Sequence, residues 1–207
     1  YGLVYAHEFY TKRNLIALAK SNEIIAKQSP LSFVLTSMMI RSTVMNRLVV
    51  NYYFHGGGGA NGAHLKGTLY VSSLPTETPI ITQLQNKSKA YSKILRLYKN
   101  IERPILSTQS LTDTNILDNS LDYIFIDPPF GGNINYSELN SIWESWIKVS
   151  TNNKHEAIQN STQKKSQHDY RYLMHKCFKE AHRVLKPGRW MTIEFSNTKS
   201  SVWNSIQ

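Results

Sequence analysis

The segment around residue 127 restricts the fold more than any other part of this sequence. Residues 123–126 (Tyr-Ile-Phe-Ile) are apolar and uncharged, which is typical of a strand covered on both faces of a parallel sheet. Residues 127–132 follow directly and read Asp-Pro-Pro-Phe-Gly-Gly. Two consecutive prolines have fixed φ angles and no N–H to donate, so the strand should end here in a stiff turn. Since ligands of open α/β sheets bind at the carboxyl ends of strands, we expect a functional site at this turn.

Apolar periodicity elsewhere predicts an alternation of helices and strands. Helices are expected at 12–28, with Thr11 as N-cap, and at 31–48, 86–100, 136–148 and 168–185. Strands are expected at 68–73 and 104–107, and a further buried strand at 190–195. A flexible glycine-rich loop near 55–67 and a polar loop near 150–167 separate them. This order predicts an α/β protein with a largely parallel sheet.

Size and composition place the chain among globular proteins. Its 207 residues fit one domain. A single cysteine, Cys177, excludes a disulfide framework and agrees with a reducing, cytoplasmic compartment. Since no apolar run approaches the roughly 18–20 residues of a membrane span, we expect no membrane partner.

The charge distribution suggests a polyanionic partner. The formal net charge is +10. Residues 104–148 contain six acidic and one basic residue, whereas 86–103 contain six basic and one acidic, and 164–189 contain eight basic and two acidic. An acidic centre between basic flanks is expected if the centre carries out chemistry and the flanks hold a polyanion. Lys164, Lys165 and Arg171 are therefore candidate phosphate contacts; the alternative is a solvated lysine-rich helix face.

The residues of the turn suit one chemical task. The Asp127 carboxylate and the Pro128 carbonyl are adjacent acceptors, so each can accept one hydrogen of an exocyclic amino group. Pro129 stiffens the turn, and Phe130 can stack on a planar ring. Nucleobases carry such amino groups, and a base in a duplex must first be flipped out. The alternative is that Asp-Pro-Pro merely ends a strand in a turn.

Several motifs resemble the S-adenosylmethionine-dependent amino-methyltransferases, whose motif IV is Asp/Asn/Ser-Pro-Pro-aromatic. Beyond this motif the sequence is similar to prokaryotic site-specific, adenine-specific DNA methylases over nearly its whole length. The segments that carry this similarity are 9–15, 67–70, 127–130, 135–139, 143–146, 183–188 and 195–199.

The resemblance implies a Rossmann-like methyltransferase fold and methyl transfer from S-adenosylmethionine to adenine N6 in double-stranded DNA, with cytosine N4 as the alternative. Asp127 and Pro128 would then bind the target amino group, and Phe130 would stack on the flipped base. Thr11, Ser107, Gln109, Ser110 and Asp127 would lie near the cofactor.

One expected motif is not found in its usual setting. Such enzymes hold the cofactor on a Phe-x-Gly-x-Gly turn that follows the first strand; residues 54–58 match this pattern in letters only. Gly56–Gly59 follows aromatic residues, but no helix start comes after it, which favours a flexible loop. We therefore expect one catalytic domain over 1–207 that is incomplete at the N-terminus, its turn supplied by missing N-terminal residues or by a partner such as a restriction subunit.

Other classes remain open at this point. RNA guanine-N2 and protein glutamine methyltransferases use a similar turn, and an inactive DNA-binding fragment is a third reading. A metal site is not expected, because His168, His175 and His182 recur every seven residues, too far apart for adjacent ligands.

Overall fold

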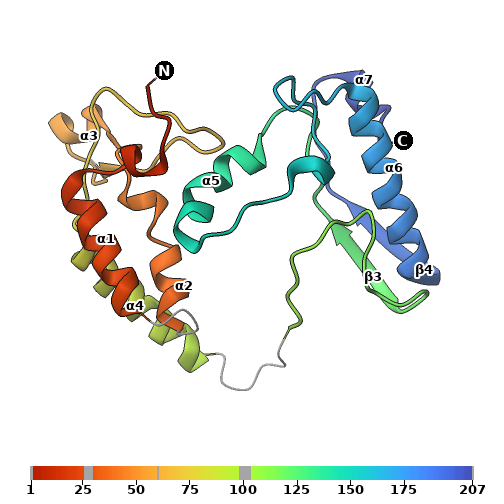
Figure 1. Cartoon of the computed structure of the whole chain (residues 1–207), viewed down its shortest axis with the longest axis horizontal. Helices are drawn as coiled ribbons and strands as arrows, with labels where there is room; N and C mark the ends of the chain where they lie inside the picture. Colours follow the sequence, from red (N-terminus) through yellow and green to blue (C-terminus); the bar gives the residue numbers. More distant parts are fainter. Residues whose placement is uncertain (1, 26–29, 60, 98–103, 207) are drawn as a thin grey trace. The chain divides into compact units, whose positions relative to one another are not determined.

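A computed structural model describes residues 2–25, 30–59, 61–97 and 104–206. The chain divides into two compact units (Figure 1). Unit 1 comprises residues 1–104 and 139–150, and unit 2 comprises 105–138 and 151–207. The structure is mixed α/β and mostly helical, so the α/β expectation holds at this level. The described residues form two small two-stranded sheets and no Rossmann-like sheet.

Unit 1 is built mainly from helices. They are η1 (Ala6–Phe9), α1 (Lys12–Ile24), α2 (Pro30–Thr36), η2 (Ile40–Ser42), α3 (Val50–His55) and α4 (Ile80–Leu97). Strands β1 (Arg47–Leu48) and β2 (Asn61–Gly62) pair antiparallel. Helices α1, α2 and α4 contact one another around a core that includes Leu18, Leu35 and Met38. Thr11 caps α1 as predicted, since its Oγ1 accepts from the Asn14 amide at 3.2 Å.

Two sequence predictions for unit 1 differ from the structure, and a third lies partly outside the described residues. The helix expected at 31–48 ends at Thr36, where serine and threonine hydroxyls donate to carbonyls three or four residues earlier and so compete with the helix ladder. No strand forms at 68–73; Leu69 and Val71 pack against the core without a ladder partner. Residues 26–28 and 98–100, the expected ends of two helices, lie outside the described residues.

Unit 2 has one parallel strand pair. Strands β3 (Leu121–Ile126) and β4 (Leu185–Ile193) run parallel, with Ile126 opposite Ile193. Helix α6 (Gln167–Val184) leads into β4, and Figure 1 shows it alongside the two strands. The unit also contains η3 (Asn153–His155) and α7 (Ser200–Trp203). Helix α5 (Tyr136–Ile147) begins in unit 2 and continues into unit 1.

The strand at 123–126 is confirmed, and the strand predicted at 190–195 forms but ends at Ile193. The predicted burial of these strands is not observed. Tyr123, Phe125 and Trp190 lie on one face of the pair and are exposed, Trp190 to 78%. The alternate residues on the opposite face, such as Ile124 and Met191, are half-buried. The strand expected at 104–107 does not form either. Ile105 and Leu106 are almost fully exposed there and meet no ladder partner in the described residues.

No helix in the described part of the chain is both long enough and apolar enough to cross a membrane.

Candidate functional site

The Asp-Pro-Pro-Phe turn begins directly after β3, where the sequence predicted it. Three successive carbonyls of this turn are taken by donors from elsewhere in unit 2. The Tyr170 hydroxyl donates to the Pro129 carbonyl at 2.8 Å, and the Asn197 side-chain amide donates to the Phe130 carbonyl at 2.9 Å. The Gln159 backbone N–H donates to the Gly131 carbonyl at 3.2 Å. These bonds fix the turn to α6, to the segment after β4 and to the 151–166 segment.

Two acceptors of the turn have no such donor. In the described residues, no group donates to the Asp127 carboxylate or to the Pro128 carbonyl. Asp127 is exposed, whereas Pro128 is buried. An acceptor without a protein donor can take one from a water molecule or a ligand. The two acceptors singled out from the sequence are therefore both unpaired in the described residues.

Glycine is required at both positions after Phe130. Gly131 has a φ of +71°, and a Cβ atom there would lie 3.1 Å from a methyl group of the buried Val202. At Gly132 a Cβ atom would lie 3.0 Å from the Gln159 carbonyl oxygen. The two glycines thus let the turn approach α7 and the 151–166 segment closely.

The Phe130 ring is held by other aromatic rings. It meets Phe195 edge to face, with centroids 5.2 Å apart and planes at 79°. Phe195 meets Trp203 in the same way at 5.0 Å. Phe130 is half-buried, so part of its ring remains accessible to a stacking partner.

Tyr136, at the start of α5, lies within electrostatic range of Asp127. Burial raises the pKa of the Tyr136 phenol, and the negative charges of Asp127 and then Glu156 raise it further. Glu156 is itself held in place, because its carboxylate accepts from the backbone and hydroxyl of Ser137 at 3.0 and 2.8 Å, and from the Gln163 amide at 3.0 Å. The start of α5 is thereby tied to the 151–166 segment.

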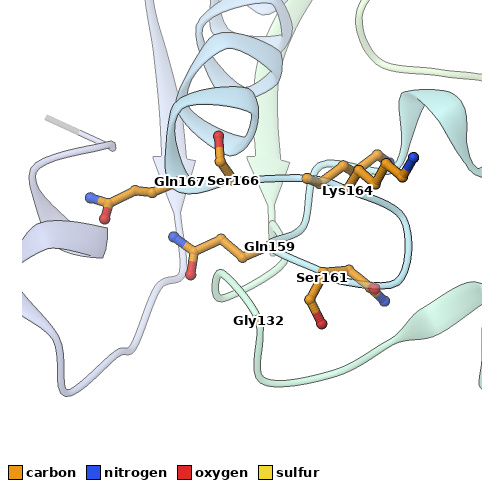
Figure 2. A pocket seen from close by; sticks show the side chains of 8 residues that line it. Gly132, Gln159, Ser161, Lys164, Ser166 and Gln167 are labelled. Atoms are coloured by element: carbon orange, nitrogen blue, oxygen red, sulfur yellow. The ribbon is translucent and has the colours of Figure 1, made fainter.

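A shallow hollow of about 530 Å³ adjoins the turn. Figure 2 shows Gly132 on the loop next to Gln159. The residues that line the hollow are polar or small: Gly132, Gln159, Asn160, Ser161, Lys164, Lys165, Ser166 and Gln167.

The three predicted phosphate contacts differ in their surroundings. Lys164 is exposed at the rim of the hollow. Lys165 lines it too, but its ammonium donates to the carbonyls of Asn153 and Glu156, and burial lowers its pKa. It therefore stabilises its own loop. Arg171 is exposed on α6 and does not line the hollow.

The predicted cofactor residues other than Asp127 are divided between the two units. Thr11 belongs to unit 1, where its hydroxyl donates to Glu77 at 2.6 Å. In unit 2, Gln109 donates to the Ser107 hydroxyl at 3.3 Å, and both are exposed. Ser110 bonds Thr112 at 2.8 Å. The side-chain hydroxyl or amide of each of these four residues has a partner within its own unit.

The glycine-rich segment at residues 56–59 offers no cofactor cradle. A Cβ atom added at Gly56, Gly58 or Gly59 would meet nothing within 4 Å, so these glycines lie in open surroundings. This supports the prediction that residues 56–59 form a loop and do not form a cofactor-binding turn. No group of three His, Cys, Asp or Glu side chains in the described ranges could hold a metal ion.

Sequence reasoning missed the donors that hold the turn, Tyr170 and Asn197. Asn197 carried a detectable signal, because it follows the end of the neighbouring parallel strand, where side chains converge on a site. Tyr170 carried none, since nothing in its helix distinguishes it from other apolar-face residues.

No family model matches the sequence, and neither a curated protein nor a solved structure matches it.

Proposed function

We propose that this chain carries the base-binding turn of an S-adenosylmethionine-dependent amino-methyltransferase with a Rossmann-like sheet, which acts on a base flipped out of double-stranded DNA. Adenine N6 is the first candidate for the methylated atom and cytosine N4 the second. One observation carries the proposal. In the turn after β3 the Asp127 carboxylate and the adjacent Pro128 carbonyl lack a donor in the described residues, whereas the next three carbonyls each have one.

Two adjacent unpaired acceptors suit an amino group with two hydrogens. With both hydrogens bonded, the nitrogen lone pair is directed away from the turn and toward an electrophile. Phe130, braced by Phe195, would stack on the base. The three paired carbonyls keep the turn rigid, so that little reorganisation is needed when the base binds.

In this proposal Asp127 mainly positions the amino group and need not act as a strong general base. A hydrogen bond to its carboxylate draws electron density toward the amino nitrogen and orients it, and the proton can leave after the nitrogen has attacked. Such positioning and electrostatic stabilisation supply large parts of an enzymatic acceleration. The methyl donor enters the proposal through the sequence resemblance, and we assign no residue of this chain to it.

Methyl transfer tests the proposal. The protein, together with the residues or partner that supply the cofactor turn, is incubated with S-adenosylmethionine labelled in its methyl group. Mixed-sequence duplex DNA, which contains any short recognition sequence, is the acceptor, and label should enter it. The Asp127→Ala variant should transfer at about 10²–10³-fold lower rate, the usual cost of one positioned transition-state contact, while its affinity for duplex DNA changes less than about twofold.

Matched measurements separate the alternatives. Asp113→Ala is the control, because Asp113 is an exposed aspartate of the same unit outside the turn; it should transfer like the unmodified protein. Equal transfer by Asp127→Ala would refute the site. Label in RNA guanine or in protein glutamine, but not in DNA, would replace the substrate. DNA binding with no label in any acceptor would favour an inactive DNA-binding protein.

A further inference from the structure

Helix α4 of unit 1 carries a basic stripe that the proposed chemistry does not use. Lys89, Lys93 and Arg96 occur at spacings of four and three, so they lie on one side of the helix. All three side chains are exposed. We call these three residues the α4 stripe. Ser88 and Ser92 lie beside it, and together with Leu97 these residues line a shallow hollow of about 650 Å³.

The opposite side of α4 fixes the helix to its unit. Ile80 and Gln83 are buried, and Tyr91 packs against the unit's core and meets Phe33 with ring centroids 6.1 Å apart. The helix contacts both α1 and α2. Figure 1 shows α4 beside these two helices. The stripe is therefore presented on a supported helix.

Some basic side chains on other elements are paired with carboxylates, whereas those of the α4 stripe form no ion pair in the described ranges. Arg13 pairs with Glu77 at 2.6 Å and Lys20 with Glu23 at 2.7 Å, and Arg183 pairs with Glu180 at 2.6 Å. Helix α4 contains no acidic residue from Ile80 to Leu97. In the described ranges no carboxylate forms an ion pair with the α4 stripe.

The spacing of the stripe matches that of nucleic-acid phosphates. At about 1.5 Å of rise per residue, the three cations span about 10 Å of helix axis. One strand of a duplex presents a phosphate about every 3.4 Å of its axis, so the α4 stripe faces about three phosphates. The adjacent serine hydroxyls add donors of the kind that bonds phosphate oxygens.

We infer that the α4 stripe binds the phosphodiester backbone of double-helical nucleic acid. The inference rests on the proposed nucleic-acid substrate and assigns part of its binding to a surface that the turn after β3 does not include. The contacts are to phosphates, so they hold the duplex without reading its sequence.

The test is the salt dependence of duplex binding. The affinity of the protein for a DNA duplex is measured by fluorescence anisotropy at salt concentrations from about 0.05 to 0.3 M. Phosphate contacts weaken over this range. The triple variant Lys89→Gln, Lys93→Gln, Arg96→Gln should lower the slope of log K against log salt by about 2–3, at about 0.9 for each lost phosphate contact. Its affinity at 0.1 M salt should fall roughly 100-fold.

A charge-matched control removes three exposed lysines of the same unit that do not line the hollow, with Lys12→Gln, Lys66→Gln and Lys148→Gln. Its slope should change by less than about 1. Restoring charge with Lys89→Arg and Lys93→Arg should keep the slope, and circular dichroism verifies that each variant is folded.

Each outcome decides the inference. An unchanged slope in the triple variant, or an equal loss in the control, would overturn it. So would loss of binding to anionic phospholipid vesicles with no change on duplexes. A reduced slope on duplex RNA, with no binding to DNA, would uphold the α4 stripe and reject the proposed DNA substrate. Methyl transfer that depends on Asp127, with no effect of the stripe, would leave the proposed function standing alone.

Discussion

The hydrogen bond from Tyr170 to the Pro129 carbonyl provides a direct test of how the turn is held. Tyr170 has no exposed surface, and its hydroxyl donates at 2.8 Å. Tyr170→Phe keeps the ring and so creates almost no cavity, but it leaves the Pro129 carbonyl without its donor. A lost hydrogen bond plus an unsatisfied buried acceptor costs about 1–2 kcal/mol.

Helix α6 supplies a matched control two residues away. Tyr172 is 54% exposed, and its ring lies 4.6 Å from the Lys176 ammonium. Tyr172→Phe removes the same atom without breaking a bond to the turn, so the free energy of unfolding should change by less than about 0.5 kcal/mol.

Urea unfolding followed by circular dichroism measures both variants. With an m-value of about 2 kcal/mol/M, Tyr170→Phe should lower the midpoint by about 0.5–1 M, and Tyr172→Phe should leave it nearly unchanged. Methyl transfer should also fall in Tyr170→Phe, because a displaced turn misaligns the Asp127 acceptor. Equal midpoints for the two variants would refute the assigned role of Tyr170.

The remaining predictions concern the same unit. Gly131→Ala should destabilise the protein by more than about 1 kcal/mol, since a left-handed φ and contact with Val202 both oppose the added methyl group. Gly188→Ala has a similar φ of +73° but open space; if it were equally destabilising in thermal unfolding, packing against Val202 would play no part. Burial raises the pKa of Tyr170 to about 12 and of Cys177 to about 11. Both groups stay protonated in the folded state at pH values at which they ionise in the unfolded chain. The free energy of unfolding should therefore be unaffected by them below about pH 9. As the pH rises toward the folded-state pKa values, it should fall by about 1.4 kcal/mol per pH unit for each group. The range from about pH 9 to pH 11 extends from the pKa of the thiol in the unfolded chain to its pKa in the folded protein. A urea midpoint that stays constant over this range would contradict the prediction.

Sequence patterns predicted those elements whose signals are local. Helices α5 and α6 begin and end within one residue of their predicted bounds, because apolar periodicity is a property of the segment itself. Strand β3 and its exit at Asp127 follow from an uncharged run and two prolines.

The errors concern elements that depend on a partner. Residues 68–73 and 104–107 have the composition of strands, but a strand exists only when another strand takes up its hydrogen bonds. The prediction that Trp190 is buried is wrong for a related reason. Apolar composition indicates that a sheet face tends to be covered, but the two-stranded sheet of unit 2 leaves the face that carries Trp190 exposed. Such information lies in contacts between distant segments and not in the segment.

The same division applies to the candidate site. The motif itself identifies Asp127 and Pro128 as acceptors, but it does not say which acceptors of the turn are already used. That depends on two donors far along the chain, Tyr170 on α6 and Asn197 after β4. By bonding the Pro129 and Phe130 carbonyls, they hold the turn, while the Asp127 carboxylate and the Pro128 carbonyl keep no donor in the described residues. Which acceptors of the turn are open is therefore determined jointly by its own sequence and by residues that no local pattern connects to it.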